Sequence, residues 1–444
     1  MVRVLRNGFL IVVVLILSTG FLMAGGRPEP AAESTRVTLT GLTNYDGRVE
    51  ADAEAQAFIY RRTAFLENNP DVTIDEEVLS YNDMVTKSRT LAAANQLPHF
   101  FKVGGDVVAT LAAGGAISSI DYIFEAYPEY RDIFLDGVFE NFQHNGQLYA
   151  VPVRLSAHTV FYNREMLRAV GFNSFPETWD EFDRLVNALN REYGSNRNFR
   201  PVALGSRATW IVNNIFSHMT LQNAGLEWYQ NLVAGNGAAW TDAPVVEVAT
   251  RLRRMVDNRT FNTDLGSIDQ NQQRALYYSG NAAMFFSGNW AIGFIHNEAP
   301  QEIIDATGVA SFPEFTNGRE RNVVAGGAGW GMGINHRDDP AVREALGRFI
   351  TQVIDLGYGQ RMAELGAIPP TRLDEGSYDS SRLNRIARET NELVGSLNVL
   401  PVMDHKLPAA MMQSVASEVQ LLLIGEVTPV QFAANLQRAW EAIQ

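Results

Sequence analysis

Strand-like and helix-like segments alternate along residues 37–105, and this alternation restricts the chain to a few folds. Apolar residues alternate with polar ones at residues 37–42, recur at helical spacing at residues 55–66, and return as a strand-like pattern at residues 72–78. A helix that we expect Asn82 to cap and a short apolar run at residues 99–103 follow. This β-α-β-α-β order predicts a parallel sheet with helices on both faces.

The composition is that of a large globular protein and argues against several partners. The chain has 444 residues, enough for two domains with their own cores, and 46% of its residues are apolar. Its net charge of −14 disfavours binding to nucleic acid or to anionic membrane surfaces. The absence of cysteine excludes disulfides, thiolate metal sites and a lipid-modified cysteine.

Residues 1–25 have the pattern of a secretory signal peptide. Arg3 and Arg6 precede an apolar run at residues 9–17, and small residues follow. Leu22 stands where the cleavage motif has a small residue, so an uncleaved N-terminal anchor is the alternative. Residues 26–35 are expected to form a flexible leader. We therefore expect a periplasmic or otherwise extracytoplasmic protein.

Residues 282–292 are predicted to form a short apolar strand, a Ser-Gly-Asn turn and a helix that starts at Trp290. In open α/β sheets, a strand that leads through a turn into a helix N-terminus makes one wall of a ligand crevice. The indole of Trp290 offers a flat apolar face that a sugar ring can cover. Met284 and Phe286 are expected in the core.

Two other segments have the composition of strands that cross between domains. Residues 149–163 hold two β-like runs around a polar middle, and Pro152 argues against one uninterrupted strand. An ordinary hairpin is the alternative. Residues 323–335 interleave apolar residues with glycine but lack the spacing of a nucleotide-binding loop. These glycines are expected to allow close backbone approach or a bend.

Helix-start signals recur in the second half of the chain. Thr178 and Glu181 have the spacing of a capping box, and Trp179 between them is expected to pack in the core. Thr428 before a proline predicts the start of the last helix, and residues 421–424 are expected to be buried.

No motif for catalysis or metal binding is apparent in the sequence. The seven histidines do not pair at helical spacing, and neither a G-x-S-x-G nucleophile motif nor a calcium loop is present. Carboxylate pairs of the glycosidase type assemble across a fold, so the sequence leaves them open. We expect no metal, no cofactor and no enzymatic activity.

Several stretches in order carry a family resemblance. They are Tyr-Ala-Val-Pro at 149–152 with Val-Phe-Tyr-Asn at 160–163, Phe-Pro-Glu-Thr-Trp-Asp-Glu-Phe at 175–182, Gly-Asn-Ala-Ala-Met at 280–284 with Gly-Asn-Trp at 288–290, and Gly-Ala-Ile-Pro-Pro at 366–370. Together they resemble the extracellular solute-binding proteins of bacterial ABC importers, in the sugar-binding group that includes maltose-binding protein. That family often carries a lipidated cysteine after the signal peptide, which this chain lacks.

The resemblance implies an α/β periplasmic-binding-protein fold, in which crossing hinge segments join two lobes around a ligand cleft. The crossings would lie near residues 154–159, 323–329 and 371–375. Lobe 1 would comprise residues 36–155 plus 328–372, and lobe 2 would comprise residues 156–327 plus 373–444. We expect a monomer that hands a small-molecule carbohydrate to the membrane subunits of an ABC permease.

The resemblance also indicates candidate ligand contacts. Trp290 would stack on a sugar, and a helix-start tryptophan buried between the lobes is the alternative. Asn289 would bind a hydroxyl, and the loop of Asn44, Tyr45 and Asp46 would contact the ligand from lobe 1. An Asx turn is the alternative for this loop. The remaining candidates lie on the crossings or near helix starts: Arg154, Ser156, His158, Trp210, Trp330 and Asp404.

Arg154 departs from sugar-binding relatives, many of which have an acidic or small polar residue near this position. Its guanidinium would bind two hydroxyls, pair with an anionic ligand group, or form a salt bridge with an acidic neighbour. The implied function is capture and delivery of a carbohydrate. Arg154 motivates an anionic or phosphorylated polyol as the alternative ligand. Carboxylate pairs of the glycosidase type, which the sequence leaves open, motivate a secreted carbohydrate-active hydrolase as a more remote alternative.

Overall fold

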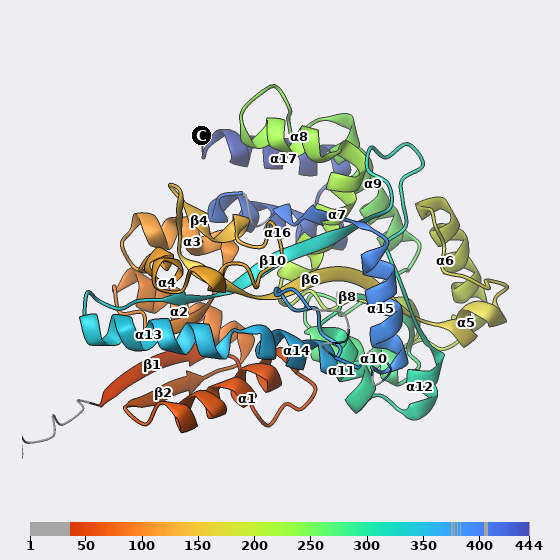
Figure 1. The fold of residues 1–444 in the computed structure, drawn as a ribbon. Coiled ribbons are helices and arrows are strands. Elements are labelled where there is room, and N and C mark those ends of the chain that lie inside the picture. Colours follow the sequence, from red (N-terminus) through yellow and green to blue (C-terminus); the bar gives the residue numbers. More distant parts are fainter. Residues whose placement is uncertain are drawn as a thin grey trace, which may run out of the picture. The chain divides into compact units, whose positions relative to one another are not determined.

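The computed structural model describes residues 36–373, 376, 378, 379, 381, 383–403 and 407–443; the expected signal peptide, the leader and Asp404 lie outside them. A mixed sheet runs through the described residues (Figure 1), with strand order β2-β1-β3-β10-β6-β8-β7, β11 beside β10 and β9 beside β6. These strands are β1 (Val37–Thr43), β2 (Val72–Val78), β3 (Phe100–Gly104), β6 (Ala150–Asn163), β7 (Arg200–Ala203), β8 (Ala282–Gly288), β9 (Thr307–Ala310), β10 (Val323–Ile334) and β11 (Asn398–Pro401). A separate small hairpin pairs β4 (Gln143–His144) with β5 (Gln147–Leu148).

The first part of the sheet follows the predicted alternation. β1 pairs in parallel with both β2 and β3, which confirms the parallel arrangement expected for residues 37–105. The helices of this half are α1 (Ala53–Asn68), α2 (Tyr81–Ala93), α3 (Gly105–Ala113), α4 (Asp121–Ala126), α13 (Pro340–Val353) and α14 (Leu356–Glu364), with short 3-10 turns at Pro128–Tyr130 and Glu140–Phe142. The predicted cap of α2 is wrong. Ser80 caps it by accepting the backbone N–H of Asp83, and Asn82 lies inside the first turn.

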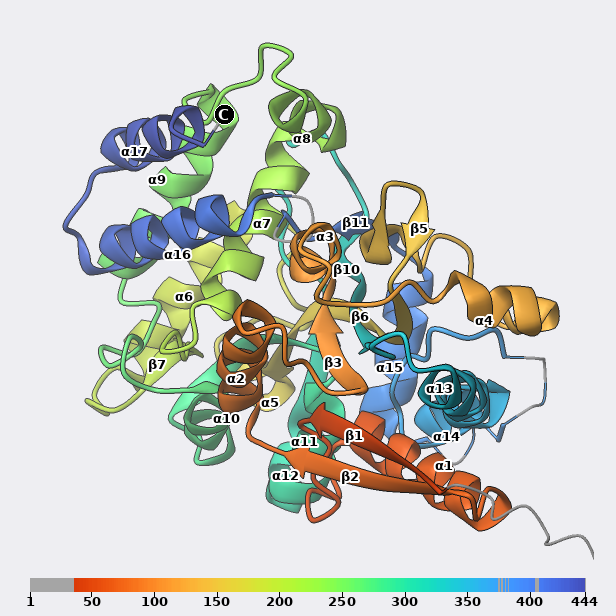
Figure 2. The ribbon, with the colours of Figure 1, turned by 90° about the vertical axis from the view of Figure 1, so that its left-hand side faces the viewer.

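The remaining helices belong mainly to the other half of the chain. They are α5 (Arg164–Ala169), α6 (Trp179–Tyr193), α7 (Trp210–Ala224), α8 (Leu226–Val233), α9 (Ala243–Asp257), α10 (Gln270–Tyr278), α11 (Ala291–Glu298), α12 (Gln301–Ala306), α15 (Arg385–Gly395), α16 (Ala409–Ile424) and α17 (Pro429–Glu441). Thr178 caps α6 and Thr428 caps α17, as predicted. α16 and α17 pack on α9 (Figure 2). Ile424 is 63% exposed at the end of α16, so its expected burial is wrong.

The two long strands β6 and β10 lie side by side and antiparallel (Figure 1). β6 is one strand of 14 residues, so the interruption expected at Pro152 does not occur, and neither does the hairpin. Pro152 faces Gly331 of β10, while β8 and β9 pair only with the later residues of β6. The strand is therefore an edge on one side at Pro152, where a missing N–H breaks no ladder bond.

Two glycines of β10 serve the roles predicted for this segment. A side chain at Gly326 would meet the backbone oxygen of Ser156 at 2.0 Å, so only glycine allows β6 to approach this closely. Gly327 has a φ of +102°, beside a shift in the pairing register with β6. L-residues with side chains rarely adopt this backbone conformation, whereas glycine adopts it without steric cost.

Separate apolar cores lie at the two ends of these long strands. β6 contributes Val153 to a first core and Val160 to a second. β10 contributes Val323 to the second core and Met332 to the first. A smaller third cluster includes Phe161 and packs beneath α11 and α15. β6 and β10 thus lie side by side, and each runs from one core to the other.

Candidate functional site

Two tryptophans and a histidine meet beside the middle of β6. Trp290 precedes α11 as its N-cap, and Trp210 is the first residue of α7. Their ring centroids lie 5.7 Å apart, and the ring of His158 stands edge-on to Trp290 at 5.3 Å. Both indoles are partly exposed. Each therefore retains apolar surface that a ligand can cover.

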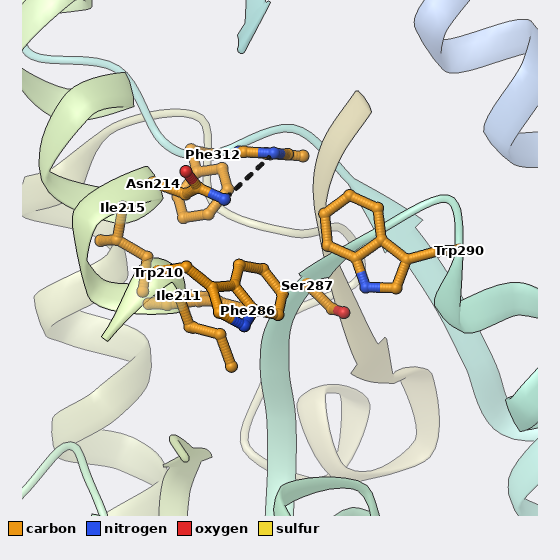
Figure 3. A pocket seen from close by; sticks show the side chains of 9 residues that line it. Trp210, Ile211, Asn214, Ile215, Phe286, Ser287, Trp290 and Phe312 are labelled. Carbon is orange, nitrogen blue, oxygen red and sulfur yellow. Dashed lines mark hydrogen bonds between the residues drawn. The ribbon is translucent and has the colours of Figure 1, made fainter. Parts of the chain in front are cut away.

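These three rings border a recess that we call the Trp290 hollow (Figure 3). Its other lining residues are the apolar Ile211, Ile215, Phe286 and Phe312 and the polar Asn214 and Ser287. The hollow is partly open, and its enclosed space is of the order of one water molecule.

A second aromatic pair lies on the side of the first core. Trp330 of β10 meets Tyr81 of α2 edge to face, with centroids 5.4 Å apart, and both side chains are partly exposed. Trp330 packs against the first core, whereas Trp210 and Trp290 pack against the second and third. Aromatic rings from both sides of the crossing strands therefore approach the same stretch of β6.

Arg154 links these two groups of rings. It pairs with Trp330 across the β6–β10 ladder, and its guanidinium carbon lies 5.7 Å from the ring centre of Trp290. Its Nη1 donates to Oε2 of Glu54 at 3.0 Å. Burial lowers the pKa of Arg154, but Glu54, Asp52 and two nearby tyrosines together raise it above its ordinary value, so it stays charged. Of the three roles considered for this arginine, the salt bridge is the one formed here.

Glu54 is the centre of a buried charge cluster that sequence reasoning missed. Its side chain is 4% exposed, and Oε1 lies 2.7 Å from Nζ of Lys102, which is 3% exposed. Burial raises the pKa of Glu54, but Lys102 and Arg154 more than offset this, so the pKa lies below its ordinary value. The only sequence signal was Lys102 itself, a charge inside the apolar run of β3.

Asn289 uses its side chain to hold α11 against β6. Its Oδ1 accepts the backbone N–H of Ala157 at 2.9 Å, and its Nδ2 donates to the carbonyl of Leu155 at 3.1 Å. Its own backbone N–H also donates to Ala157, at 3.0 Å. Asn289 is only 5% exposed. These bonds place the neighbouring Trp290.

The loop after β1 holds three candidate residues, and their side chains have different surroundings. Tyr45 is 1% exposed and donates its hydroxyl to Glu54 at 2.5 Å, so it belongs to the charge cluster. Asp46 accepts the backbone N–H of Arg48 at 3.0 Å, which is the Asx-turn alternative, and bonds from Arg48 lower its pKa to about 2. Asn44 is partly buried. Ser156 lies on β6 opposite Gly327, partly exposed.

Two buried polar atoms beside these rings have no hydrogen-bond partner within the described part of the chain: the acceptor Oδ1 of Asn214, which lines the hollow, and the donor Nε of Arg154. The Oδ1 of Asn44, in the loop after β1, is also buried and without a partner there. Leaving such atoms unpaired is costly. A ligand hydroxyl both donates and accepts, so it can satisfy either kind. Nothing in the sequence singled out Asn214 or Tyr81.

Two kinds of feature are absent from the described residues. Among residues 36–443, apart from the gaps given above, no group of three or more His, Asp or Glu side chains is placed to hold a metal ion. Within the same part of the chain, no helix is long and apolar enough to cross a membrane.

Comparison with known proteins identifies the family. The profile of the bacterial extracellular solute-binding proteins matches residues 46–350, well over half of the chain. The chain belongs to this family. The match confirms the resemblance seen in the sequence and makes the protein one of a class that binds solutes outside the cytoplasm.

Relatives and solved structures agree with this family assignment. The mannitol-binding protein of Pseudomonas aeruginosa is 25% identical over 69% of this chain and 68% of its own length. A binding protein of Brucella abortus is 20% identical over 58% of this chain, so the match spans only 59% of that relative.

A solved chitin oligosaccharide binding protein has a TM-score of 0.81 and 23% identity, covering 91% of this chain and 98% of its own. Maltose-bound MalE3 of T. maritima has a TM-score of 0.74 and 19% identity, covering 92% and 100%. These likenesses confirm the two-lobed α/β fold of this solute-binding protein.

Proposed function

We propose that this solute-binding protein captures a neutral carbohydrate between two lobes and delivers it to an ABC-type permease. The observation that carries the proposal is the meeting of partly exposed indoles with buried, unpaired donor and acceptor atoms at the crossing strands. Indole faces suit the apolar faces of sugar rings, and the unpaired atoms suit hydroxyls. Relatives named for mannitol and for multiple sugars support the ligand class.

We infer lobe boundaries from the exchange of cores along β6 and β10. Lobe 1 comprises residues 36–155 plus 328–372, and lobe 2 comprises residues 156–327 plus 373–444. The passage of β6 from Val153 in the first core to Val160 in the second supports the first boundary. The passage of β10 from Val323 to Ala328 supports the second. Closure of these lobes would bring Trp330 and Trp290 onto one ligand.

Charge compensation favours a neutral ligand over an anionic one. Glu54 pairs with both Lys102 and Arg154. The nearby carboxylate of Asp52 acts on the same two cations and raises the pKa of each. Arg154 therefore has an internal partner and needs no ligand anion. We also propose binding without turnover, because the family consists of binding proteins.

A sugar panel read by tryptophan fluorescence and isothermal titration calorimetry tests the proposal. We expect saturable binding of a neutral sugar, loss of at least about tenfold in affinity in Trp290→Ala, and full recovery of unchanged sugar after incubation. Trp228→Phe is the matched control, because Trp228 lies on α8 and bonds Asp242 away from the crossing strands. Equal affinity of Trp290→Ala and the parent protein would remove the stacking role, and binding of anionic sugars alone would overturn the neutral-ligand proposal.

A further inference from the structure

The last residue of β8, Gly288, is buried against the indole of Trp290. A Cβ at this position would lie under 3.0 Å from both Cζ3 and Cη2 of the ring, and 2.6 Å from the backbone oxygen of Ala157. Real Cβ atoms essentially never approach other atoms so closely. A side chain at position 288 would therefore force the indole or the backbone of β6 to move.

The strand pairing explains why the ring fits here. Gly288 is the direct antiparallel partner of His158 on β6, so the two positions face the same side of the sheet. The missing side chain of Gly288 leaves a gap beside the imidazole, and the six-membered ring of Trp290 occupies it. Figure 3 shows the indole at this end of β8, beside Ser287.

Other neighbours limit where the indole can turn. The ring of Trp210 lies 5.7 Å away between centroids, and the guanidinium carbon of Arg154 lies 5.7 Å from the ring centre of Trp290. The preceding residue is held as well, because Asn289 bonds to β6 through both its amide and its backbone N–H. A side chain packed on so many sides has few orientations open to it.

We propose that Gly288 is a positioning residue that fixes the indole of Trp290 as a preformed stacking surface, an inference that rests on the proposed carbohydrate function. The glycine itself touches no sugar. It admits the six-membered ring to the sheet beside His158, so that the exposed part of the indole has its binding orientation in the free protein. A surface fixed in advance strengthens binding, because the ligand does not have to order it.

A double-mutant cycle on sugar affinity, measured by calorimetry, tests this role. The probe is the tightest binder among mannitol, maltose and cellobiose. Gly288→Ala should weaken its binding at least about tenfold, because the displaced indole no longer meets the sugar. In a Trp290→Ala background, the same change should alter affinity less than about twofold, since no indole remains to be displaced. The contact with Ala157 is present in both backgrounds, so the cycle cancels it.

An equal fall in affinity in both backgrounds would mean that Gly288 acts through the backbone of β6, and it overturns the inference. An unchanged affinity of Gly288→Ala in the parent background overturns it too.

Fluorine NMR reads the ring directly and needs no ligand. Labelling with 7-fluorotryptophan leaves Cζ3 and Cη2 unsubstituted, and among the seven tryptophans the resonance that Trp290→Phe removes belongs to Trp290. We expect one resonance for Trp290 in the sugar-free parent and a shifted or split one in Gly288→Ala. Several resonances in the parent, or an unchanged one in Gly288→Ala, overturn the inference. The parent spectrum decides the question if Gly288→Ala does not fold.

Gly308→Ala is the matched control. Gly308 lies on β9 opposite Tyr162 of β6, and a Cβ there would also lie under 3.0 Å from an aromatic ring. The change should disturb the same sheet without touching Trp290, so sugar affinity and the Trp290 resonance should stay as in the parent. An equal loss of affinity in Gly308→Ala overturns the inference. If no sugar of any kind binds the parent protein, the carbohydrate function is wrong, and the fluorine spectra still decide whether Gly288 positions the indole.

Discussion

Glu54 is a buried carboxylate whose ion pairs join α1 to β3 and β6. It is buried between two cations, with Lys102 at 2.7 Å and Arg154 at 3.0 Å, and it accepts the hydroxyl of Tyr45. Buried ion pairs contribute little over apolar replacements, but removing one partner leaves the other charge uncompensated. The cluster is therefore sensitive to single changes.

Glu54→Gln should lower the free energy of unfolding by about 3–5 kcal/mol, measured by urea denaturation, because it leaves the buried Lys102 and the partly buried Arg154 without their carboxylate. Glu77→Gln provides the control. It breaks the pair between Glu77 and Lys87, whose side chains are 46% and 40% exposed, and should cost less than about 1 kcal/mol. A similar small loss in both variants would show that Glu54 is not electrostatically coupled to its neighbours.

His218 should make stability depend on pH below neutrality. It is 1% exposed on α7, its Nδ1 accepts the N–H of Ala325 at 3.2 Å, and burial lowers its pKa to about 4. The unfolded chain takes up this proton near the ordinary pKa of 6.5, while the folded chain resists until about pH 4. Stability is therefore unaffected above pH 6.5 and falls by about 3 kcal/mol as the pH drops through this window.

The variant His218→Gln isolates this contribution. Glutamine can still accept from Ala325 but does not titrate, so the unfolding free energy of the variant should fall less steeply between pH 6.5 and pH 4. His296→Gln, at an exposed position on α11, should keep the parent slope. Parallel curves for the parent and His218→Gln would rule out the buried histidine as the source.

At the scale of elements, local signals in the sequence proved reliable. The strand, turn and helix start of residues 282–292 correspond to β8 and α11, and Met284 and Phe286 are buried as expected. Trp179 packs in the core. These features depend on residues close together in the chain, so periodicity and capping patterns reveal them. Pro152 misled because its effect depends on which edge of β6 is paired.

Contacts between elements that are far apart in the chain could not be predicted from the sequence. Glu54 begins α1, Lys102 lies on β3 and Arg154 on β6, and only the folded sheet brings them together. Asn289 also looked like a ligand contact because it precedes Trp290, yet its amide is occupied by the backbone of β6. Side-chain type indicated possible chemistry, whereas the partner of each side chain depended on the fold.

Asn289→Ala should weaken both the fold and ligand binding. The change leaves a buried N–H of Ala157 and a carbonyl of Leu155 unpaired, which should lower the unfolding free energy by about 2 kcal/mol. Sugar affinity should also fall, because α11 no longer holds Trp290 against β6. Asn297→Ala on the exposed side of α11 should alter neither. Unchanged affinity in Asn289→Ala would mean that Trp290 is placed by other contacts.

At the scale of the whole molecule, the crossing strands β6 and β10 connect separate apolar cores. Trp330 packs on one core, Trp290 on another, and Arg154 of β6 contacts both Glu54 and the ring of Trp290. A ligand held between the lobes should therefore stabilise both, whereas a ligand held by one surface should stabilise only that side. Hydrogen exchange distinguishes these cases because it reports the opening of each segment separately.

With the identified sugar at 100 times its dissociation constant, we expect about 2.7 kcal/mol of added stability. Amide exchange should slow both in β3, beside Trp330, and in the first turn of α11, beside Trp290. A sugar that does not bind serves as the control. Slowing confined to α11 would place the ligand on lobe 2 alone. If the ligand bridges both lobes, Trp290→Ala should abolish the slowing of amide exchange in β3 as well as in α11. The contacts to β3 would depend on a ligand that Trp290, at the start of α11, helps to hold.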